Sequence, residues 1–200
     1  RSKADRAHGM GYCGPNRPFQ GRQIDSAVLF GYAGGGLGTT APYYPSVEGV
    51  LNLDGTNSYV QLPPLNIDFS QGFTIEAVVY YNSFSSWSRI LDIGNGAGSD
   101  NILLANVGQT SNLALSSMIG GSDKQVAAVN AIPLNTWTHL CATLDATGKV
   151  TLYVNGSMVG TGQSQIPRNL LRSNCYIGRS NWGSDGYFNG KIANVRIWQR

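Results

Sequence analysis

Short segments in which apolar and polar residues alternate follow one another from Gly49 to the end of the chain, separated by turn residues. Residues 136–145 alternate almost throughout, and residues 150–154 run into Asn155-Gly156, the strongest signal for a two-residue hairpin turn in the sequence. Asp54-Gly55 is a similar turn signal between the strand-like residues 50–53 and 59–62. A period of two indicates strands, and the one helical candidate, residues 166–171, is long enough only for a single turn. This pattern predicts an all-β fold, an antiparallel sandwich or barrel.

Residues 1–22 differ from the rest of the chain, because they are polar and basic and contain glycine and proline but no periodic pattern. They are predicted to form a flexible basic leader or linker. No linker interrupts residues 49–200, so residues 23–200 are predicted to form one domain, and 200 residues with 42% hydrophobic content suffice for one core. A chain that starts at Arg1 looks like an excised or mature fragment, which indicates one domain of a larger protein.

Charge and hydropathy argue against two classes of partner. Charged residues make up 12% of the chain, the net charge is +3, and the basic residues do not gather into the dense stripe of a nucleic-acid-binding surface. No apolar run approaches the ~18–20 residues of a membrane span. We therefore expect no nucleic-acid partner and no membrane insertion.

The three cysteines, Cys13, Cys141 and Cys175, allow at most one internal disulfide and leave one thiol over. None has the paired spacing of a zinc site. Cys13 could pair with either of the other two, or all three could be free and behave as small hydrophobic residues.

Five motifs occur in the order seen in one family: Leu51-Asn52-Leu53-Asp54-Gly55, Phe73-Thr74-Ile75-Glu76-Ala77, Trp137-Thr138-His139-Leu140, Leu152-Tyr153-Val154-Asn155-Gly156 and Phe188-Asn189-Gly190-Lys191-Ile192. Over residues 49–198 the chain resembles laminin-G-like jelly-roll domains of the concanavalin A-like lectin/glucanase superfamily. The resemblance implies an antiparallel two-sheet jelly-roll β-sandwich, a secreted or cell-surface location, and a glycan or an extracellular protein as ligand.

The chain is also similar to pentraxins, a calcium-dependent branch of this fold. In pentraxins an Asp-Asn pair that opens a strand binds calcium, and Asp100-Asn101 stand in the same place here. The pentraxin Glu-Gln-Asp run is replaced by Ser180-Asn181-Trp182, which keeps one amide oxygen, and Asp185 follows. The resemblance therefore implies a Ca²⁺ site formed by Asp100, Asn101, Asn181 and Asp185, with backbone carbonyls and water completing the six to eight oxygens that calcium takes. Alternatively, these residues simply form turns.

The superfamily includes glucanases and lyases, so catalysis is a question for individual residues. Glycoside hydrolysis usually needs two carboxylates, ~5–5.5 Å apart for retention and ~6.5–9.5 Å for inversion. The only glutamates are Glu48 and Glu76, and Glu76 alternates with apolar neighbours in a strand-like segment. His8 lies in the leader and His139 in a strand-like segment, which gives no support to a nucleophilic triad. The domain is predicted not to be an enzyme.

Carbohydrate binding is the leading functional hypothesis, because aromatic rings in loops can stack on the apolar faces of sugars while planar polar side chains bind the hydroxyl groups. Such aromatic residues can instead plug the ends of a sandwich. Arg89 and Asp92 lie near the end of one loop, and Arg179 lies on another. An arginine–aspartate pair among these residues could tie the two loops together or contact a ligand. A protein-interaction, adhesion or spacer role without sugar binding is the alternative. The candidate sugar-binding residues are Trp87, Asn95, Arg179, Asn181, Trp182 and Tyr187.

Overall fold

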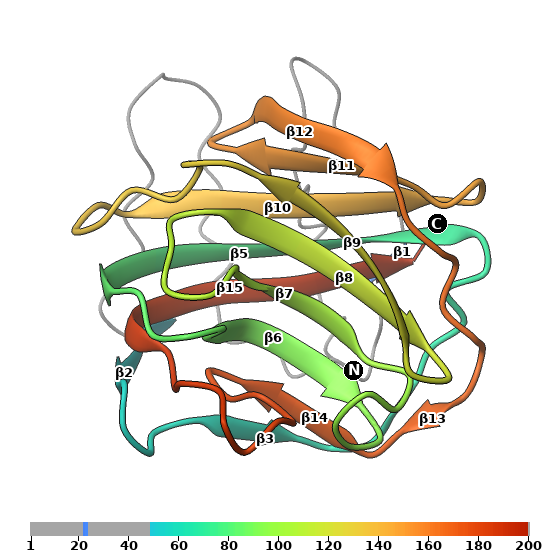
Figure 1. The fold of residues 1–200 in the computed structure, drawn as a ribbon, viewed down its shortest axis with the longest axis horizontal. Helices are drawn as coiled ribbons and strands as arrows, with labels where there is room; N and C mark the ends of the chain where they lie inside the picture. The colour runs from blue at the N-terminus through green and yellow to red at the C-terminus, as the bar shows by residue number, and fades with distance from the viewer. Residues whose placement is uncertain (1–21, 24–48, 200) are drawn as a thin grey trace, which may run out of the picture.

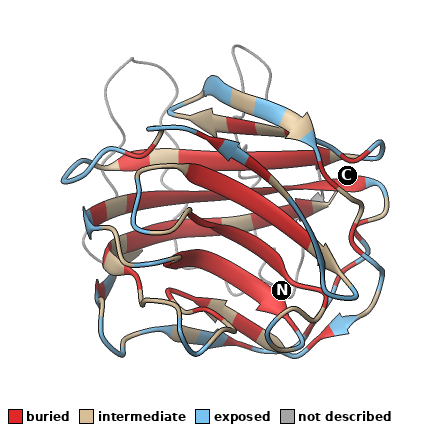
Figure 2. Cartoon of the chain, viewed as in Figure 1, coloured by how far each residue is buried: buried red, intermediate tan, exposed pale blue. Residues whose placement is uncertain are grey.

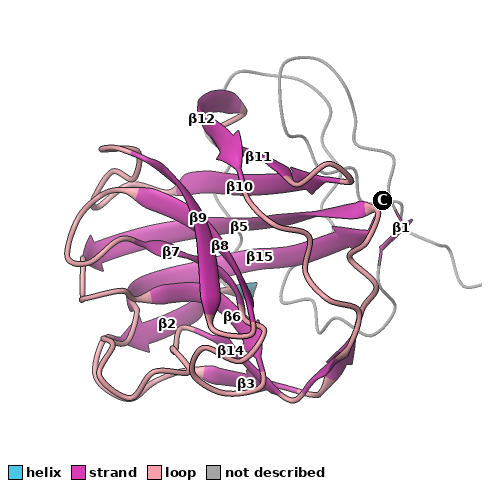
Figure 3. Ribbon diagram, turned by 45° about the vertical axis from the view of Figure 1, so that its right-hand side comes forward, coloured by secondary structure: helices cyan, strands magenta, loops and turns pink. Residues whose placement is uncertain are grey.

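Two antiparallel sheets pack face to face and enclose one apolar core (Figures 1 and 3). The computed structural model describes residues 22–23 and 49–199. Every strand pair in it is antiparallel, and no α-helix occurs in these two ranges. The predicted antiparallel jelly-roll β-sandwich is confirmed.

The first sheet has the order β1-β15-β5-β10-β11-β12, and β2 also pairs with β15. Its strands are β1 (Arg22–Gln23), β2 (Leu51–Asp54), β5 (Gly72–Ser83), β10 (Thr138–Asp145), β11 (Lys149–Val154), β12 (Ser157–Gln163) and β15 (Asn189–Gln199). The second sheet has the order β3-β14-β6-β7-β8-β9. Its strands are β3 (Val60–Leu62), β6 (Arg89–Gly94), β7 (Ile102–Asn106), β8 (Leu113–Ile119), β9 (Ser122–Ala128) and β14 (Asn174–Ile177). The short strands β4 (Leu65–Asn66) and β13 (Leu171–Arg172) pair with each other.

Alternation along the strands places the core between the sheets, as the predicted period of two requires. In β5, Phe73, Ile75 and Val79 are fully buried and belong to the core cluster, which Ile93 and Ile102 of the second sheet also join. Buried residues accordingly run along the central strands, and exposed ones gather at the turns and on the edge strand β12 (Figure 2).

Hairpin turns follow from residues that accept positive φ. Asn155 and Gly156 have φ values of 48° and 80° and join β11 to β12, so the predicted hairpin is confirmed. Gly120 and Gly121, with φ values of 54° and 84°, join β8 to β9 in the same way. Strand β9 was not predicted from the sequence, because its first four residues are polar and mask the alternation.

The turn signal at Asp54-Gly55 does not make a hairpin. Strand β2 pairs with β15 in the first sheet, whereas β3 pairs with β14 in the second, so the chain crosses between sheets here. The carboxylate of Asp54 instead stabilises the crossing by accepting hydrogen bonds from the backbone N–H groups of Thr56, Asn57 and Ser58 at 2.8–3.1 Å.

The predicted leader, residues 1–22, lies outside the described residues except for Arg22, which forms β1 with Gln23 and pairs with the end of β15. Cys141 is disulfide-bonded and Cys175 is a buried free thiol, whereas Cys13 lies outside the described residues. No membrane-spanning helix is found in the part of the chain that the structure describes.

Candidate functional site

Two loops at the same end of the second sheet meet over its outer face. They are the 84–88 loop between β5 and β6 and the 178–188 loop between β14 and β15. The N–H of Gly186 donates to the carbonyl of Ser86 at 2.7 Å. A Cβ atom at Gly186 would lie 2.5 Å from Cβ of Ser85, so this close approach requires glycine.

Arg89 joins these two loops from the first position of β6. Its guanidinium carbon lies 5.6 Å from the ring centroid of Trp87 and 5.4 Å from that of Trp182, so the cation is within cation–π distance of both indole rings. It donates at 2.6 Å to the backbone carbonyl of Trp87 and at 2.7 Å to the carboxylate of Asp185. Arg89 itself is 3% exposed, whereas both tryptophans are partly exposed. The arginine–aspartate pair between the loops is therefore Arg89–Asp185, and not a pair of Arg179 with Asp92.

The 84–88 loop is fixed by Asn106 at the end of β7. The Asn106 amide donates to the carbonyls of Ser85 and Gly108 at 3.0 and 2.6 Å, and its oxygen accepts from Ser88 Oγ. Trp87 has a φ of 53°, which is uncommon for a bulky residue, and its N–H donates to the Gly108 carbonyl at 2.8 Å. Backbone strain of this kind persists where the surroundings hold it, and it concentrates at binding sites.

Asp92 lies beneath the 178–188 loop and ties it to the sheet. Its Oδ2 accepts the backbone N–H of Asn181 at 2.9 Å, and its Oδ1 accepts the side-chain amides of Asn181 and Asn101 at 2.8 and 2.9 Å. Nε of Arg89 lies 3.7 Å from Oδ2. Burial raises the pKa of Asp92, and the hydrogen bonds from both asparagines together with the charge of Arg89 oppose that rise.

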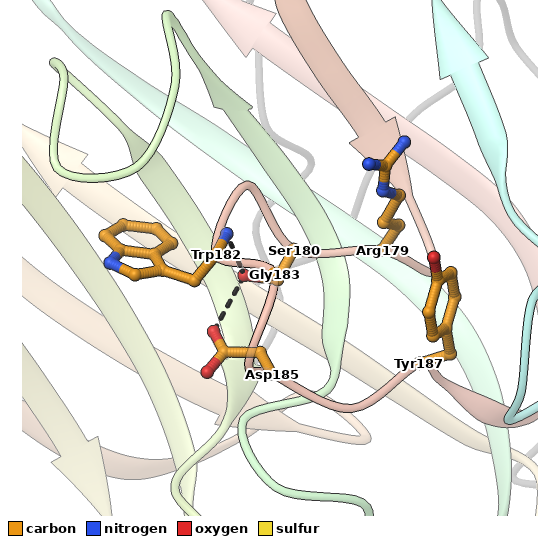
Figure 4. Close-up of a pocket in the computed structure, with 6 residues that line it drawn as sticks. All are labelled: Arg179, Ser180, Trp182, Gly183, Asp185 and Tyr187. Atoms are coloured by element: carbon orange, nitrogen blue, oxygen red, sulfur yellow. Dashed lines mark hydrogen bonds between the residues drawn. The ribbon is translucent and has the colours of Figure 1, made fainter.

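A shallow depression opens on the 178–188 loop, and Figure 4 shows its lining residues. Trp182 lies on one side of the loop, whereas Arg179 and the hydroxyl of Tyr187 lie on the other (Figure 4). The cavity volume is about 40 Å³, much smaller than the ~300–1,000 Å³ of pockets that enclose small molecules. The depression can therefore contact one edge or face of a ligand rather than surround it. Its lining residues are Arg179, Ser180, Trp182, Gly183, Asp185 and Tyr187.

A cluster of tyrosines surrounds Arg179 beside the depression. Its guanidinium carbon lies 4.7 Å from the ring centroids of both Tyr59 and Tyr176. The ring of Tyr187 lies 6.1 Å from that of Tyr59. Tyr59 and Tyr176 were not predicted as site residues. The one signal in the sequence is that Tyr176 stands between Cys175 and Ile177 in a strand-like segment, where alternation turns it to the opposite face.

The structure divides the predicted sugar-binding residues. Trp87, Trp182, Arg179 and Tyr187 belong to the two loops or line the depression, and Asn181 anchors the loop from below. Asn95 does not join them, because it follows the opposite end of β6, about 20 Å along the strand from Arg89. Its amide instead bridges the Leu171 carbonyl and the Ser173 N–H, both at 2.8 Å.

The four predicted calcium ligands do not converge. Asp100 receives two hydrogen bonds from the guanidinium of Arg168, at 2.7 and 2.9 Å, at the far end of the sheet. Asp185 accepts from Arg89, and the amides of Asn101 and Asn181 meet on Asp92. No group of three or more His, Cys, Asp or Glu side chains suited to a metal ion occurs in the described ranges. As arranged, these residues do not fit the oxygen shell of Ca²⁺.

Glu76 lies on the first sheet, away from this site, in a buried cluster. Its carboxylate contacts His139 Nε2 at 3.0 Å, Trp198 Nε1 at 3.1 Å and Arg196 Nη1 at 3.4 Å. Burial opposes ionisation of Glu76, but the hydrogen bond and charge of His139, the hydrogen bond of Trp198 and the charge of Arg196 outweigh it and lower the pKa. These contacts match a structural role in the strand ladder.

Comparison with known proteins identifies the family. A family model described as the concanavalin A-like lectin/glucanases superfamily matches residues 54–200. Pentraxin-related protein PTX3 from Bos taurus is 28% identical over 94 residues, which cover 41% of this chain and 24% of that protein. The matched region thus spans about a quarter of the length of this relative.

Three solved structures share the fold. Domains LG4-5 of the mouse laminin alpha1 chain give a TM-score of 0.60 at 18% identity, covering 78% of this chain and 42% of theirs. Domain 4 of the extracellular arabinanase AbnA from Geobacillus stearothermophilus, in complex with arabinotriose, gives 0.60 at 23% identity, covering 81% and 76%. The CBM40 of the Ruminococcus gnavus IT-sialidase, bound to alpha2,3 sialyllactose, gives 0.57 at 14% identity, covering 70% and 91%. With its two-sheet architecture and the matching family model, the chain belongs to the concanavalin A-like lectin/glucanases superfamily, as a laminin-G-like domain.

Proposed function

We propose that the domain is a non-catalytic carbohydrate-binding module and that the two loops around Arg89 hold its binding surface. The observation that carries this proposal is the pair of partly exposed tryptophans, Trp87 and Trp182, that both contact one buried arginine. Aromatic rings offer a flat apolar surface on which the C–H face of a sugar can lie.

The contacts of Arg89 hold the two rings in place before any ligand arrives. Its bonds to the Trp87 carbonyl and to Asp185 fix the guanidinium, and the guanidinium in turn supports both indoles. A surface that is already ordered loses little conformational entropy on binding, so even a shallow contact area can give useful affinity.

The fold neighbours support a sugar ligand. The arabinanase domain was solved with arabinotriose and the CBM40 with sialyllactose. We propose that the parent protein is larger and lies outside the cell, as the extracellular arabinanase does.

The acidic side chains of the site are already engaged in contacts within the protein, because Asp185 pairs with Arg89 and Asp92 is buried under Asn181. Neither carboxylate is therefore free to act as one of the two that glycoside hydrolysis needs.

A glycan array with variants of the two tryptophans tests the proposal. We expect Trp182→Ala and Trp87→Ala to weaken binding at least about tenfold, because such anchors carry much of the energy of an interface. Trp137→Ala is the matched control, since Trp137 is also partly exposed but packs on Tyr80 in the other sheet. Melting temperatures separate loss of binding from unfolding. Unchanged binding by both loop variants would contradict the assignment of the site, and an array without any bound glycan would contradict sugar binding.

A protein-interaction or spacer module is the second candidate. Apolar side chains are exposed on β12 and after β9: Met158 is 63% exposed, Val159 40% and Val129 74%. Strand β12 is also the edge of the first sheet, where unpaired backbone groups can accept another strand. An empty glycan array would favour this candidate.

Calcium dependence stays a prediction. One feature in its favour is the buried Oδ1 of Asn101, which has no hydrogen-bond partner. Against it, an ion that used Asp100 or Asp185 would have to displace an arginine from each. The test is the melting temperature in millimolar Ca²⁺ and in EDTA, because a ligand that binds only the folded state raises it by mass action. Identical values would contradict calcium binding.

A further inference from the structure

We propose that Arg179 forms an anion subsite, so that the preferred ligands are glycans carrying a carboxylate or sulfate group. This inference rests on the carbohydrate-binding function proposed above and specifies its ligand class. It is carried by the placement of one guanidinium at the edge of the depression.

Two tyrosine rings contact this guanidinium and position it. Its central carbon lies 4.7 Å from the centroids of both Tyr59 and Tyr176, and those two rings are themselves 5.8 Å apart at 81°. Because the two rings are nearly perpendicular, the planar cation can lie parallel to only one of them, and the other ring faces part of its N–H edge. The rings thus position the side chain, and the N–H donors that do not face a ring remain available.

No carboxylate among residues 49–199 forms an ion pair with Arg179, and no side-chain hydrogen bond of its guanidinium is found within that range. The other four arginines of this range are engaged: Arg89 with Asp185, Arg168 with Asp100, Arg196 with Glu76, and Arg172 with backbone carbonyls. Arg179 is therefore the arginine of the described domain whose fork is open to a ligand. A guanidinium fork matches the two oxygens of a carboxylate or sulfate, which gives short charge-assisted hydrogen bonds.

Asp185 lines the same depression but does not neutralise the positive charge of Arg179. Asp185 accepts from Arg89 at 2.7 Å and from Ser180 Oγ at 2.7 Å, so its carboxylate is already compensated. Figure 4 shows Arg179 and the Tyr187 hydroxyl together on the side away from Trp182. A sugar ring on Trp182 could thus extend an anionic substituent toward Arg179, with the Tyr187 hydroxyl as a further donor.

An array of matched glycan pairs tests this inference. Each pair shares one neutral core and differs by a sialic acid, a glucuronic acid or a sulfate, so the arms distinguish the carboxylate from the sulfate. We expect the wild type to bind acidic members at least about tenfold more tightly than neutral ones, because hydrogen bonds between an arginine and an anionic group are shorter and stronger than those to a neutral group. Raising salt from about 0.1 M to about 1 M shortens the Debye length from ~10 Å to ~3 Å and should reduce the preference.

Arg179→Gln should remove the preference for the acidic member of each pair, and Arg179→Lys should keep only part of it, because lysine lacks the planar fork. Lys149→Gln removes an exposed positive charge from the other sheet and should change nothing. Melting temperatures confirm that each variant is folded. Equal binding of acidic and neutral members by the wild type, or an acid preference that survives in Arg179→Gln, would overturn the anion subsite and leave the carbohydrate-binding function standing. Failure to bind any glycan would overturn both.

Discussion

Asp92→Asn is the substitution that most directly tests how the 178–188 loop is held. The change keeps the shape of the side chain but replaces one carboxylate oxygen by an NH₂ group. In the protein, Oδ1 accepts two asparagine amides, and Oδ2 accepts the backbone N–H of Asn181 at 2.9 Å. The introduced amide can keep its oxygen toward the two side chains, but its NH₂ then faces the Asn181 N–H donor-to-donor.

The magnitude follows from that conflict. A buried donor left without an acceptor costs ~1–3 kcal/mol, and part of this is offset because the substitution also removes a buried charge whose pKa is raised by burial. We expect a net loss of about 2 kcal/mol in the free energy of unfolding, which is a fall of roughly 4–8 °C in melting temperature for a domain of this size.

Urea unfolding at neutral pH, followed by tryptophan fluorescence, measures this loss. Hydrogen exchange supplies a second readout, because the Asn181 N–H should exchange faster when it loses its acceptor. The matched control is Asp68→Asn: Asp68 is exposed, and the asparagine oxygen can still accept the Ser70 N–H, so a change below ~0.5 kcal/mol is expected. A free energy of unfolding within ~0.5 kcal/mol of the wild type, together with unchanged exchange of the Asn181 N–H, would show that Asp92 does not hold the loop.

Three further predictions concern the framework of the domain. Gly190 has a φ of 147° and its Cβ would overlap the Tyr80 carbonyl, so Gly190→Ala should cost at least ~2 kcal/mol in urea unfolding, and a neutral effect would count against the packing described. The lowered pKa of Glu76 means that its contribution to stability is present above the ordinary value of 4.5 and is lost as pH falls toward the lowered one. The difference in unfolding free energy between wild type and Glu76→Gln should therefore narrow between pH 6 and pH 3, and a constant difference would rule this linkage out. Burial raises the pKa of the Cys175 thiol to about 11, so peptide mapping after alkylation of the native protein should find Cys175 unmodified, and rapid labelling would show that it is accessible.

Most strands were predictable because their signals are local. The segment 73–81 alternates in the sequence, and β5 spans Gly72–Ser83. Local turn chemistry was equally informative at Asn155-Gly156, where both residues have positive φ. At Asp54-Gly55 the same kind of signal predicted a turn but not its consequence, because the choice between a hairpin and a crossing between sheets depends on distant partners, β15 and β14.

Several residues of the candidate site stood out in the sequence, but their arrangement in space did not. Trp87 and Trp182 stood out as aromatic residues in loops, yet nothing in the sequence places both against Arg89. Asn95 follows the same strand that Arg89 begins, but a strand of six residues carries it to the opposite end of the sheet. Asp100 likewise looked like a calcium ligand, but its partner, Arg168, is far away in the sequence. Loop residues are brought together by the crossovers of the sandwich, which local periodicity does not encode.

The 178–188 loop lacks regular secondary structure but is held at several points. At its base the Phe188 N–H donates to the Gly178 carbonyl at 3.0 Å, and inside it Ser180 Oγ bridges Asp185 and the Trp182 N–H. Two further anchors, Asp92 and Arg89, belong to a buried strand of the second sheet. A loop held in this way need not close over a ligand, so recognition depends on the groups already presented at its surface. Selectivity would then be set by the Trp182 ring and the open fork of Arg179, and substitutions of these two residues should change which glycan binds more than they change stability.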